Sequence, residues 1–425
     1  MRFASLLVSV ALFVTPVVAG GLDGSWKGTW TKNGDSIPVI MRFQMTPDHL
    51  EGSFDSDALQ VAKIPFAEVD VNGDHVNFLL KGDNSTTTFN GRFAGDALSG
   101  RFTEGSTQGT FDFTRSAFPS DALSQRDVQF RDGAVTLAGT LLAPHGGQRH
   151  PAILFLQGSG PEGRWANRYL AQKFAEAGFV ALIYDKRGVG QSTGDWKTAG
   201  FDVLADDGAA GVRFLQAQPD VDATRVGIYG HSQGGTLAPL VADKISNLHF
   251  VIASAASGIS PADTEIFSVG NSIGITDLKP SERGDAESYV RELVHVAYDG
   301  ADRAPLDQMA ARFKSRDWYF DPPPPDNSYW AISRAIAHYV PSEAWQKTTA
   351  RALLVYGDHD ARSPAQPSIA AIQAALAHAG RKPATVRIYP GADHIFMLVG
   401  SSPKDGWPRR VPGYAQDLIA WAKAQ

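Results

Sequence analysis

The stretch from Val226 to Gly235 reads VGIYGHSQGG, and the rest of the chain is organised around it. An apolar run that ends at Tyr229 leads directly into a Gly-x-Ser-x-Gly pattern, which predicts a strand that turns sharply into a helix. Gly230 and Gly234 leave room for this turn because they carry no side chain. The turn would hold the hydroxyl group of Ser232 in the open, so we identify Ser232 as the candidate nucleophile.

The sequence on either side of this turn favours an oxyanion hole. Residues 236–242 predict a buried helix, which places the backbone N–H of Gln233 at a helix N-terminus facing developing negative charge. A second loop, GSG at 158–160, follows the apolar run 151–156, and its glycines would let backbone N–H groups approach an acyl oxygen. The loop has neither the Gly-Lys-Ser/Thr nor the Gly-x-Gly-x-x-Gly pattern of phosphate-binding loops. We therefore expect Gly158 and Ser159 to supply the rest of the hole.

Composition excludes several other kinds of chemistry. The chain of 425 residues has 39 basic and 45 acidic side chains, a net charge of -6, which does not favour nucleic acid as a partner. It contains no cysteine, which excludes disulfides, thiolate metal sites and a cysteine nucleophile. The length suggests two domains, one of them large.

The first residues resemble an export signal. One arginine precedes the apolar run 6–14, and small residues precede a cleavage point after Ala19. The run is too short to span a bilayer comfortably, although a membrane anchor or a buried helix is the alternative. We expect residues 1–19 to be a signal peptide and the mature protein to be secreted or periplasmic, with no stable membrane span.

Residues 20–116 predict a small all-β domain. Short alternating runs are broken by Gly, Asn and Asp, which is typical of an antiparallel barrel or sandwich. The opening Gly-x-Trp-x-Gly and the repeated Gly-x-Phe segments resemble lipocalin-like bacterial β-domains. Trp26 and Trp30 could line a ligand cup or form the core. A polar linker is predicted at 117–126.

From residue 127 to 425 the pattern changes to alternating strands and helices. This alternation predicts an α/β fold with a mostly parallel sheet, helices on both faces, and functional groups at the carboxyl ends of the strands. The alternation stops at about 258–350, where helical periodicity predicts an inserted helical cap. Four aromatic residues of the cap are candidates for the substrate pocket, with packing inside the cap as the alternative: Trp318, Tyr319, Tyr329 and Trp330.

Three motifs in this order resemble the α/β-hydrolase superfamily: LQGSGP at 156–161, YDKRGVGQS at 184–192, and GHSQGG at 230–235. More narrowly, the chain is similar to secreted bacterial serine esterases related to the serine aminopeptidase and dienelactone hydrolase families. The likeness covers about residues 128–425. Dienelactone hydrolases use a cysteine nucleophile, which this chain lacks. The charged residues of YDKRG are expected to fix a loop against the sheet, although Lys186 or Arg187 could contact substrate.

The resemblance implies a Ser-His-Asp triad. A serine hydroxyl needs a general base, and the base needs a group that orients it. In this superfamily the order along the chain is Ser, acid, His. The resemblance selects Asp360, which follows the strand 351–357, with Asp358 as the second choice and Asp393 as a weaker one. It selects His394, which follows the last strand, as the base.

The other histidines near these motifs have simpler interpretations. His231 flanks the nucleophile and is expected to face away from it. His359 could be read as a metal ligand, but no second histidine stands four residues from it on a helix. We expect no metal and no cofactor.

The favoured function is hydrolysis of a small-molecule carboxylic ester by an exported serine hydrolase. A peptidase or a thioesterase would use the same residues, since the triad does not determine the leaving group. A peptidase would need an acidic side chain to bind a substrate amine, and the acids of the cap, Glu282, Asp285 and Glu287, look like a solvated helix face. An inert envelope protein that binds a ligand is the alternative from another class. Oligomeric state is left open.

Overall fold

The computed structural model describes residues 21–82, 85–117, 123–400 and 406–425. The predicted signal peptide and part of the predicted linker lie outside the described residues. The described chain divides into two compact units: the smaller has its described residues within 21–57 and 63–117, and the larger within 58–62 and 123–425. No described helix combines the length and the apolar character needed to cross a membrane.

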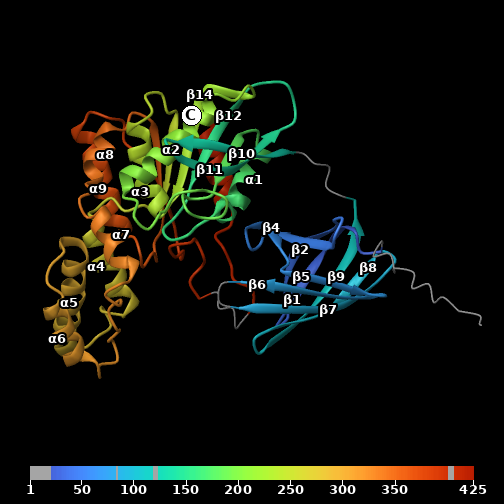
Figure 1. Ribbon diagram of the computed structural model, residues 1–425, viewed down its shortest axis with the longest axis horizontal. Coiled ribbons are helices and arrows are strands. Elements are labelled where there is room, and N and C mark those ends of the chain that lie inside the picture. Colours follow the sequence, from blue (N-terminus) through green and yellow to red (C-terminus); the bar gives the residue numbers. More distant parts are fainter. Residues whose placement is uncertain (1–20, 83–84, 118–122, 401–405) are drawn as a thin grey trace, which may run out of the picture. The chain divides into compact units, whose positions relative to one another are not determined.

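The smaller unit is a single antiparallel sheet that curls on itself (Figure 1). Its strand order is β4-β3-β2-β1-β9-β8-β7-β6-β5. The strands are β1 (Gly24–Lys32), β2 (Asp35–Met45), β3 (Leu50–Ser56), β4 (Val61–Pro65), β5 (Glu68–Asn72), β6 (His75–Lys81), β7 (Thr86–Ala94), β8 (Ala97–Glu104) and β9 (Thr107–Ser116).

Aromatic side chains fill the concave side of this sheet. The alternation of buried and exposed residues along each strand sends every second side chain inward. Trp30 is 2% exposed, and its ring lies 4.7 Å from that of Phe54 and 5.0 Å from that of Phe89. Trp26 is also fully buried. Both tryptophans are therefore core residues in this structure.

The larger unit contains an eight-stranded mixed sheet of order β10-β11-β13-β12-β14-β15-β16-β17. β10 (Leu123–Asp132) and β11 (Val135–Pro144) are antiparallel, and all strands from β13 onwards in this order pair in parallel. The parallel strands are β12 (His150–Leu156), β13 (Val180–Tyr184), β14 (Val221–His231), β15 (Phe250–Ser254), β16 (Arg351–Gly357) and β17 (Thr385–Tyr389).

Helices cover both faces of this sheet (Figure 1). On one face, Leu154 and Leu156 of β12 share a core with residues of α2 (Phe201–Gln216), α3 (Gln233–Asp243) and α9 (Ala365–His378). On the other face, Ile153 and Phe155 share a core with residues of α1 (Arg168–Glu176) and α10 (Tyr414–Lys423). The continuous apolar run of β12 thus supplies both cores, as expected for a strand buried on two sides. A short 3-10 helix, η1 (Arg164–Asn167), precedes α1.

A group of helices interrupts the α/β alternation between β15 and β16. It consists of α4 (Pro261–Ser272), α5 (Pro280–Val294), the π-helical turn η2 (His295–Asp299), α6 (Ala304–Phe313), α7 (Ser328–Ile336) and α8 (Pro341–Lys347). Four of these helices begin with proline in their first turn, where the missing N–H is not needed. Helices α4 to α7 have an aromatic core of their own, centred on Tyr289, Phe313 and Trp318.

Candidate active site

Ser232 lies in a strained turn between β14 and α3. Its φ of 55° and ψ of -119° are unusual for a residue with a side chain. A Cβ atom at Gly230 would come within 2.1 Å of the Gly234 carbonyl oxygen, and one at Gly234 would come within 2.8 Å of the Gln157 carbonyl oxygen. The glycines of the Gly-x-Ser-x-Gly pattern are thus required by the approach of backbone atoms. The Ser232 N–H donates to the Ser254 carbonyl at the end of β15 (2.8 Å), which fixes the turn.

His394 and Asp360 reach Ser232 from two neighbouring strands. Asp360 follows β16 and His394 follows β17, and the carboxyl ends of these parallel strands lie on the same edge of the sheet as that of β14. His394 Nε2 lies 2.9 Å from Ser232 Oγ, and His394 Nδ1 lies 2.9 Å from Asp360 Oδ2. The structure brings together the three side chains that the sequence selected.

Two backbone N–H groups hold the Asp360 carboxylate in place. Its side chain is 1% exposed, and Oδ1 accepts the N–H groups of Arg362 and Ser363, both at 2.8 Å. Charge-assisted bonds of this kind stabilise a buried carboxylate as an anion. Asp360 is therefore positioned to hold the Nδ1–H tautomer of His394, which leaves Nε2 free to accept the serine proton.

The two other candidate acids do not face the imidazole. Asp358 Oδ1 accepts the Gly391 N–H (2.7 Å) and lies 2.6 Å from His359 Nδ1 on the surface. Hydrogen bonds from the His359 ring and the Gly391 N–H lower the pKa of Asp358. Asp393 Oδ1 accepts the N–H groups of Ile395 and Met397. Both carboxylates cap turns.

The loop 157–163 differs from the sequence expectation at Gly158. The Gly158 N–H donates to Glu162 Oε2 at 2.6 Å, so this group is already engaged. The prediction that Gly158 supplies an oxyanion donor is therefore wrong in this structure. Ser159 is exposed and lines the same cavity as Ser232. Gln233 is the first residue of α3, where a backbone N–H has no acceptor within the helix. Ser159 and Gln233 are the donors that the geometry favours.

A cavity of about 190 Å³, here called the catalytic pocket, opens beside Ser232 and His394. It is closed by cap residues from α4, η2 and α7, including Thr264, Glu265, Tyr298 and Ile336. Its lining is more polar than that of a simple acyl pocket, since Arg362 and several hydroxyl groups also face it.

Glu265 places a carboxylate in the catalytic pocket. Oε1 accepts the Tyr329 hydroxyl at 3.1 Å. Burial raises the pKa of Glu265, while the Tyr329 hydroxyl and the positive charge of Arg362 oppose the rise. No motif in the sequence points to Glu265, because its place in the pocket depends on how α4 folds over the end of the sheet.

The four aromatic residues predicted for the substrate pocket lie elsewhere. Trp318 and Trp330 are buried in the cap core, and the Trp330 indole N–H donates to the Pro324 carbonyl at 2.8 Å. Tyr319 donates its hydroxyl to Asp321 (2.6 Å). Among the described residues that line the catalytic pocket, none of the four appears. Trp318 and Trp330 thus belong to the cap core, Tyr319 and Tyr329 pack against it, and Tyr329 donates its hydroxyl to the pocket residue Glu265.

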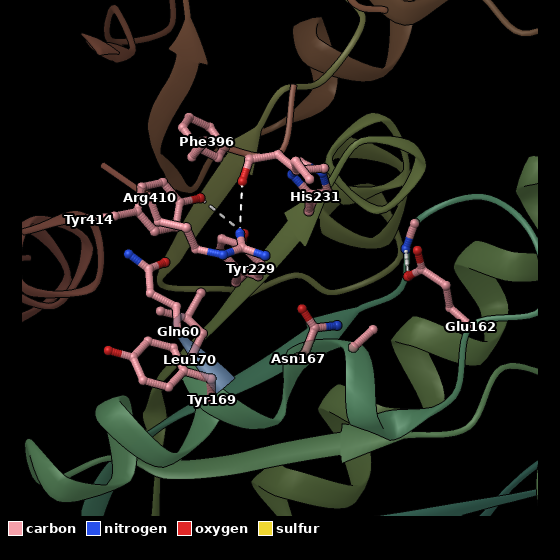
Figure 2. A pocket seen from close by; sticks show the side chains of 13 residues that line it. Gln60, Glu162, Asn167, Tyr169, Leu170, Tyr229, His231, Phe396, Arg410 and Tyr414 are labelled. Carbon is pink, nitrogen blue, oxygen red and sulfur yellow. Dashed lines mark hydrogen bonds between the residues drawn. The ribbon is translucent and has the colours of Figure 1, made fainter. Parts of the chain in front are cut away.

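His231, the residue before the nucleophile, lies beside the base of the triad. Its ring lies 5.0 Å from that of His394, and it lines both the pocket shown in Figure 2 and a second cavity that Ser232 also lines. Its Nδ1 lies 3.3 Å from Ser254 Oγ. A chain of hydroxyl groups extends from there, because Ser254 Oγ lies 2.8 Å from the Tyr414 hydroxyl, which lies 3.0 Å from the Tyr229 hydroxyl. Burial, with the charge of His394 adding to it, lowers the pKa of His231 to about 3. A neutral His231 can lie beside His394 when His394 becomes charged.

The charged residues after β13 are fixed by ion pairs or buried bonds. Arg187 pairs with Asp207 at 2.7 Å, and Asp185 pairs with Arg164 at 2.9 Å. Arg187 therefore fixes the loop, as expected from the sequence, and it does so by pairing with α2. No group of three or more His, Asp or Glu side chains in the described part of the chain is arranged to hold a metal ion.

Comparison with known proteins places this site in a family. The model of the X-Pro dipeptidyl-peptidase (S15 family) matches residues 132–379 of the 425. An uncharacterized protein of Pseudomonas aeruginosa is 34% identical over 126 residues, 28% of this chain and 34% of that protein. Dipeptidyl peptidase 8 of Mus musculus is 32% identical over 136 residues, 28% of this chain and 15% of that protein. The matched segment thus spans about a third of the length of the first relative and a smaller part of the second.

Solved structures of similar fold include that Pseudomonas aeruginosa protein (21% identity, TM-score 0.46, 72% of this chain and 95% of that chain). They also include an esterase of Pyrococcus furiosus (16% identity, TM-score 0.46, 73% of this chain and 94% of that chain). The family model spans more than half of the chain, including the serine turn and Asp360. The protein therefore belongs to the X-Pro dipeptidyl-peptidase (S15) family, within the α/β-hydrolase superfamily.

Proposed function

We propose that the protein is a serine hydrolase that cleaves carboxylic esters through an acyl-enzyme intermediate. The single observation that carries this proposal is the continuous hydrogen-bonded series Asp360, His394, Ser232, with both contacts of His394 at 2.9 Å. The same series argues against an inert ligand-binding protein, because a binding role would not require it.

The geometry supports the following reaction. Ser232 Oγ attacks the ester carbonyl carbon while its proton passes to His394 Nε2, and the carbonyl oxygen becomes an oxyanion bound by the N–H groups of Gln233 and Ser159. The C–O bond to the leaving group breaks, and His394 returns the proton to the leaving alkoxide. Water then attacks the acyl-enzyme by the reverse route, which releases the acid and restores Ser232.

A second candidate is an aminopeptidase that uses the same triad, and Glu265 favours it. A partly buried carboxylate that faces the catalytic pocket can bind the free amine of an aminoacyl or peptidyl group. The family name points the same way, since X-Pro dipeptidyl-peptidases act on peptides. A thioesterase remains the third possibility within the same mechanism, but no described residue favours it.

One experiment tests the proposal and separates its two forms. The protein is labelled with a fluorophosphonate probe and assayed with neutral aryl esters of increasing acyl length and with aminoacyl and X-Pro arylamides. We expect labelling at Ser232 and turnover of short neutral esters. Absence of both would overturn the proposal.

The variant Glu265→Gln distinguishes the substrates. If the pocket binds an amine, this change lowers kcat/KM for amine-bearing substrates by about 10- to 100-fold and leaves neutral esters within about threefold. Glu287→Gln, on the exposed face of α5, is the matched control. Equal losses on both kinds of substrate would rule out amine binding by Glu265.

We further propose that residues 1–19 direct export, so that the enzyme acts outside the cytoplasm. The support is the charged start, short apolar run and small residues before Ala19. Detection of the full-length chain only in the cytoplasm of its host would overturn this part.

A further inference from the structure

Lys186 is a buried lysine that contacts both predicted halves of the oxyanion hole. It follows β13, the parallel neighbour of β12, and is 3% exposed. Its Nζ donates to the Gly158 carbonyl, to the Gly160 carbonyl at 2.8 Å, and to Gln233 Oε1 at 3.1 Å. One ammonium group therefore joins the loop 157–163 to the first residue of α3.

The hydrogen bond between Lys186 and the Gly158 carbonyl determines the direction of the Ser159 N–H. The described chain contains no cis peptide bond, and in a trans peptide the carbonyl and the following N–H point in opposite directions. Because the Gly158 carbonyl faces Lys186, the Ser159 N–H faces away from it. Ser159 lines the catalytic pocket with Ser232, so this direction leads to the side on which the oxyanion would form.

Glu162 fixes the preceding peptide in the same way. The Gly158 N–H donates to the Glu162 carboxylate at 2.6 Å, while the Lys186 backbone N–H donates to the Glu162 carbonyl at 3.4 Å. The loop is thus held by Glu162 on one peptide and by Lys186 on the next. Neither peptide can rotate without breaking a bond to a charged group.

We propose that Lys186 is a positioning residue of the oxyanion hole, which orients the Ser159 N–H and aligns it with the N–H of Gln233. This inference rests on the proposed acyl-transfer function. Lys186 does not touch the substrate, because its three donors are used by Gly158, Gly160 and Gln233.

The cost of burying the Lys186 ammonium group indicates that this lysine does more than form a structural ion pair. No carboxylate among the described residues lies within ion-pair distance of Lys186 Nζ, whose acceptors are all neutral oxygens. Burying an ammonium group on neutral partners is unfavourable, and burial accordingly lowers the pKa of Lys186 to about 8, with Glu162 opposing the shift. An uncharged side chain would bind these carbonyls less strongly, so the charge serves to hold the loop.

The first test replaces Lys186 with methionine, which has similar length and no donor. Removal of one oxyanion donor in a serine hydrolase lowers kcat by about 10²–10³. We expect Lys186→Met to lower kcat by about that factor or somewhat less, with KM within about threefold. The affinity for a trifluoromethyl ketone, which forms a tetrahedral oxyanion on the serine, should fall in parallel with kcat/KM.

The matched control is Lys347→Met, which removes an exposed lysine paired with Asp243. Both variants are compared in the full chain by thermal unfolding. Lys186→Met that folds and keeps its kcat and its ketone affinity would overturn the inference. A wild-type protein that neither reacts with fluorophosphonate nor hydrolyses esters would overturn the proposed function as well, so the two failures differ.

The second test needs no variant. As pH rises through about 8, Lys186 loses its proton and has two N–H groups for three acceptors, so kcat of the wild type should fall. The charged groups next to Lys186 are engaged by other partners, since the Glu162 carboxylate accepts the Gly158 N–H and Asp185 and Arg187 are ion-paired with Arg164 and Asp207. A kcat that stays constant across the loss of the Lys186 proton, followed by NMR of the labelled lysine side chain, would overturn the inference even if the methionine variant did not fold.

Discussion

The two sides of Ser232 are built in different ways. On the base side, His394 and Asp360 act through their side chains, and each follows a strand of the parallel sheet. On the oxyanion side, the acting groups are backbone N–H groups, and their directions depend on Lys186 and Glu162. The base side is therefore specified by residue identity, and the oxyanion side by the orientation of peptide planes.

This difference explains which parts of the site a sequence motif can predict. A motif shows which side chain stands at a position, so it can select a triad. It cannot show which way a flexible glycine-rich loop turns each peptide, because glycine allows several orientations. The error at Gly158 follows directly, since its N–H is used by Glu162.

The largest effect is expected on the base side. Replacing Ser232 with Ala, or His394 with Ala, should lower turnover of an aryl ester by about 10⁴–10⁶ with folding unchanged, and the double variant should lose little more. The reason is that the serine is not activated without the base. Burst kinetics and circular dichroism check this result. Near-full activity of Ser232→Ala would show that another nucleophile acts.

A smaller effect is expected for the acid. Asp360→Asn should lower kcat by about 10³–10⁴, because the imidazole loses its orientation and its preferred tautomer while the nucleophile remains. Asp358→Asn is the matched control, since this exposed carboxylate bonds to Gly391 and His359 instead. The kcat values of both variants are measured together, and a larger loss for Asp358→Asn would reverse our assignment of the acid.

The smallest effect is expected at Glu162 on the oxyanion side. Glu162→Gln keeps an acceptor for the buried Gly158 N–H and should change kcat by no more than about threefold. Glu162→Leu leaves that N–H without its partner, a loss of about 1–3 kcal/mol, and should lower kcat by about tenfold as the loop rearranges. Steady-state kinetics on one ester checks both variants. A rise in kcat for Glu162→Leu would mean that Gly158 is a donor that Glu162 restrains.

The cap shows a second limit of sequence reasoning. Aromatic side chains are as suitable for a core as for a substrate pocket. The cap needed a core because α4 to α7 lie outside the main sheet, and Trp318 and Trp330 fill it. The cap residues that line the catalytic pocket instead include Glu265, Tyr298 and Ile336, which no sequence motif marks.

The sequence alone predicts that Lys186 lies near the oxyanion loop. β12 and β13 are adjacent and parallel, so the residues that follow them must lie close together. The sequence does not show that Lys186 Nζ contacts both the carbonyl groups of this loop and Gln233 Oε1. That contact requires the end of β14 to lie beside β12 as well.

By itself the sequence determined the serine turn, the strand ends that carry Asp360 and His394, and the α/β alternation, because these depend on local geometry and hydrophobic periodicity. Only the tertiary structure decided the polarity of the catalytic pocket, the place of His231 beside His394, and the orientation of the oxyanion loop. These features arise where segments distant in the chain meet, and there the burial of a charged or polar group selects its partners.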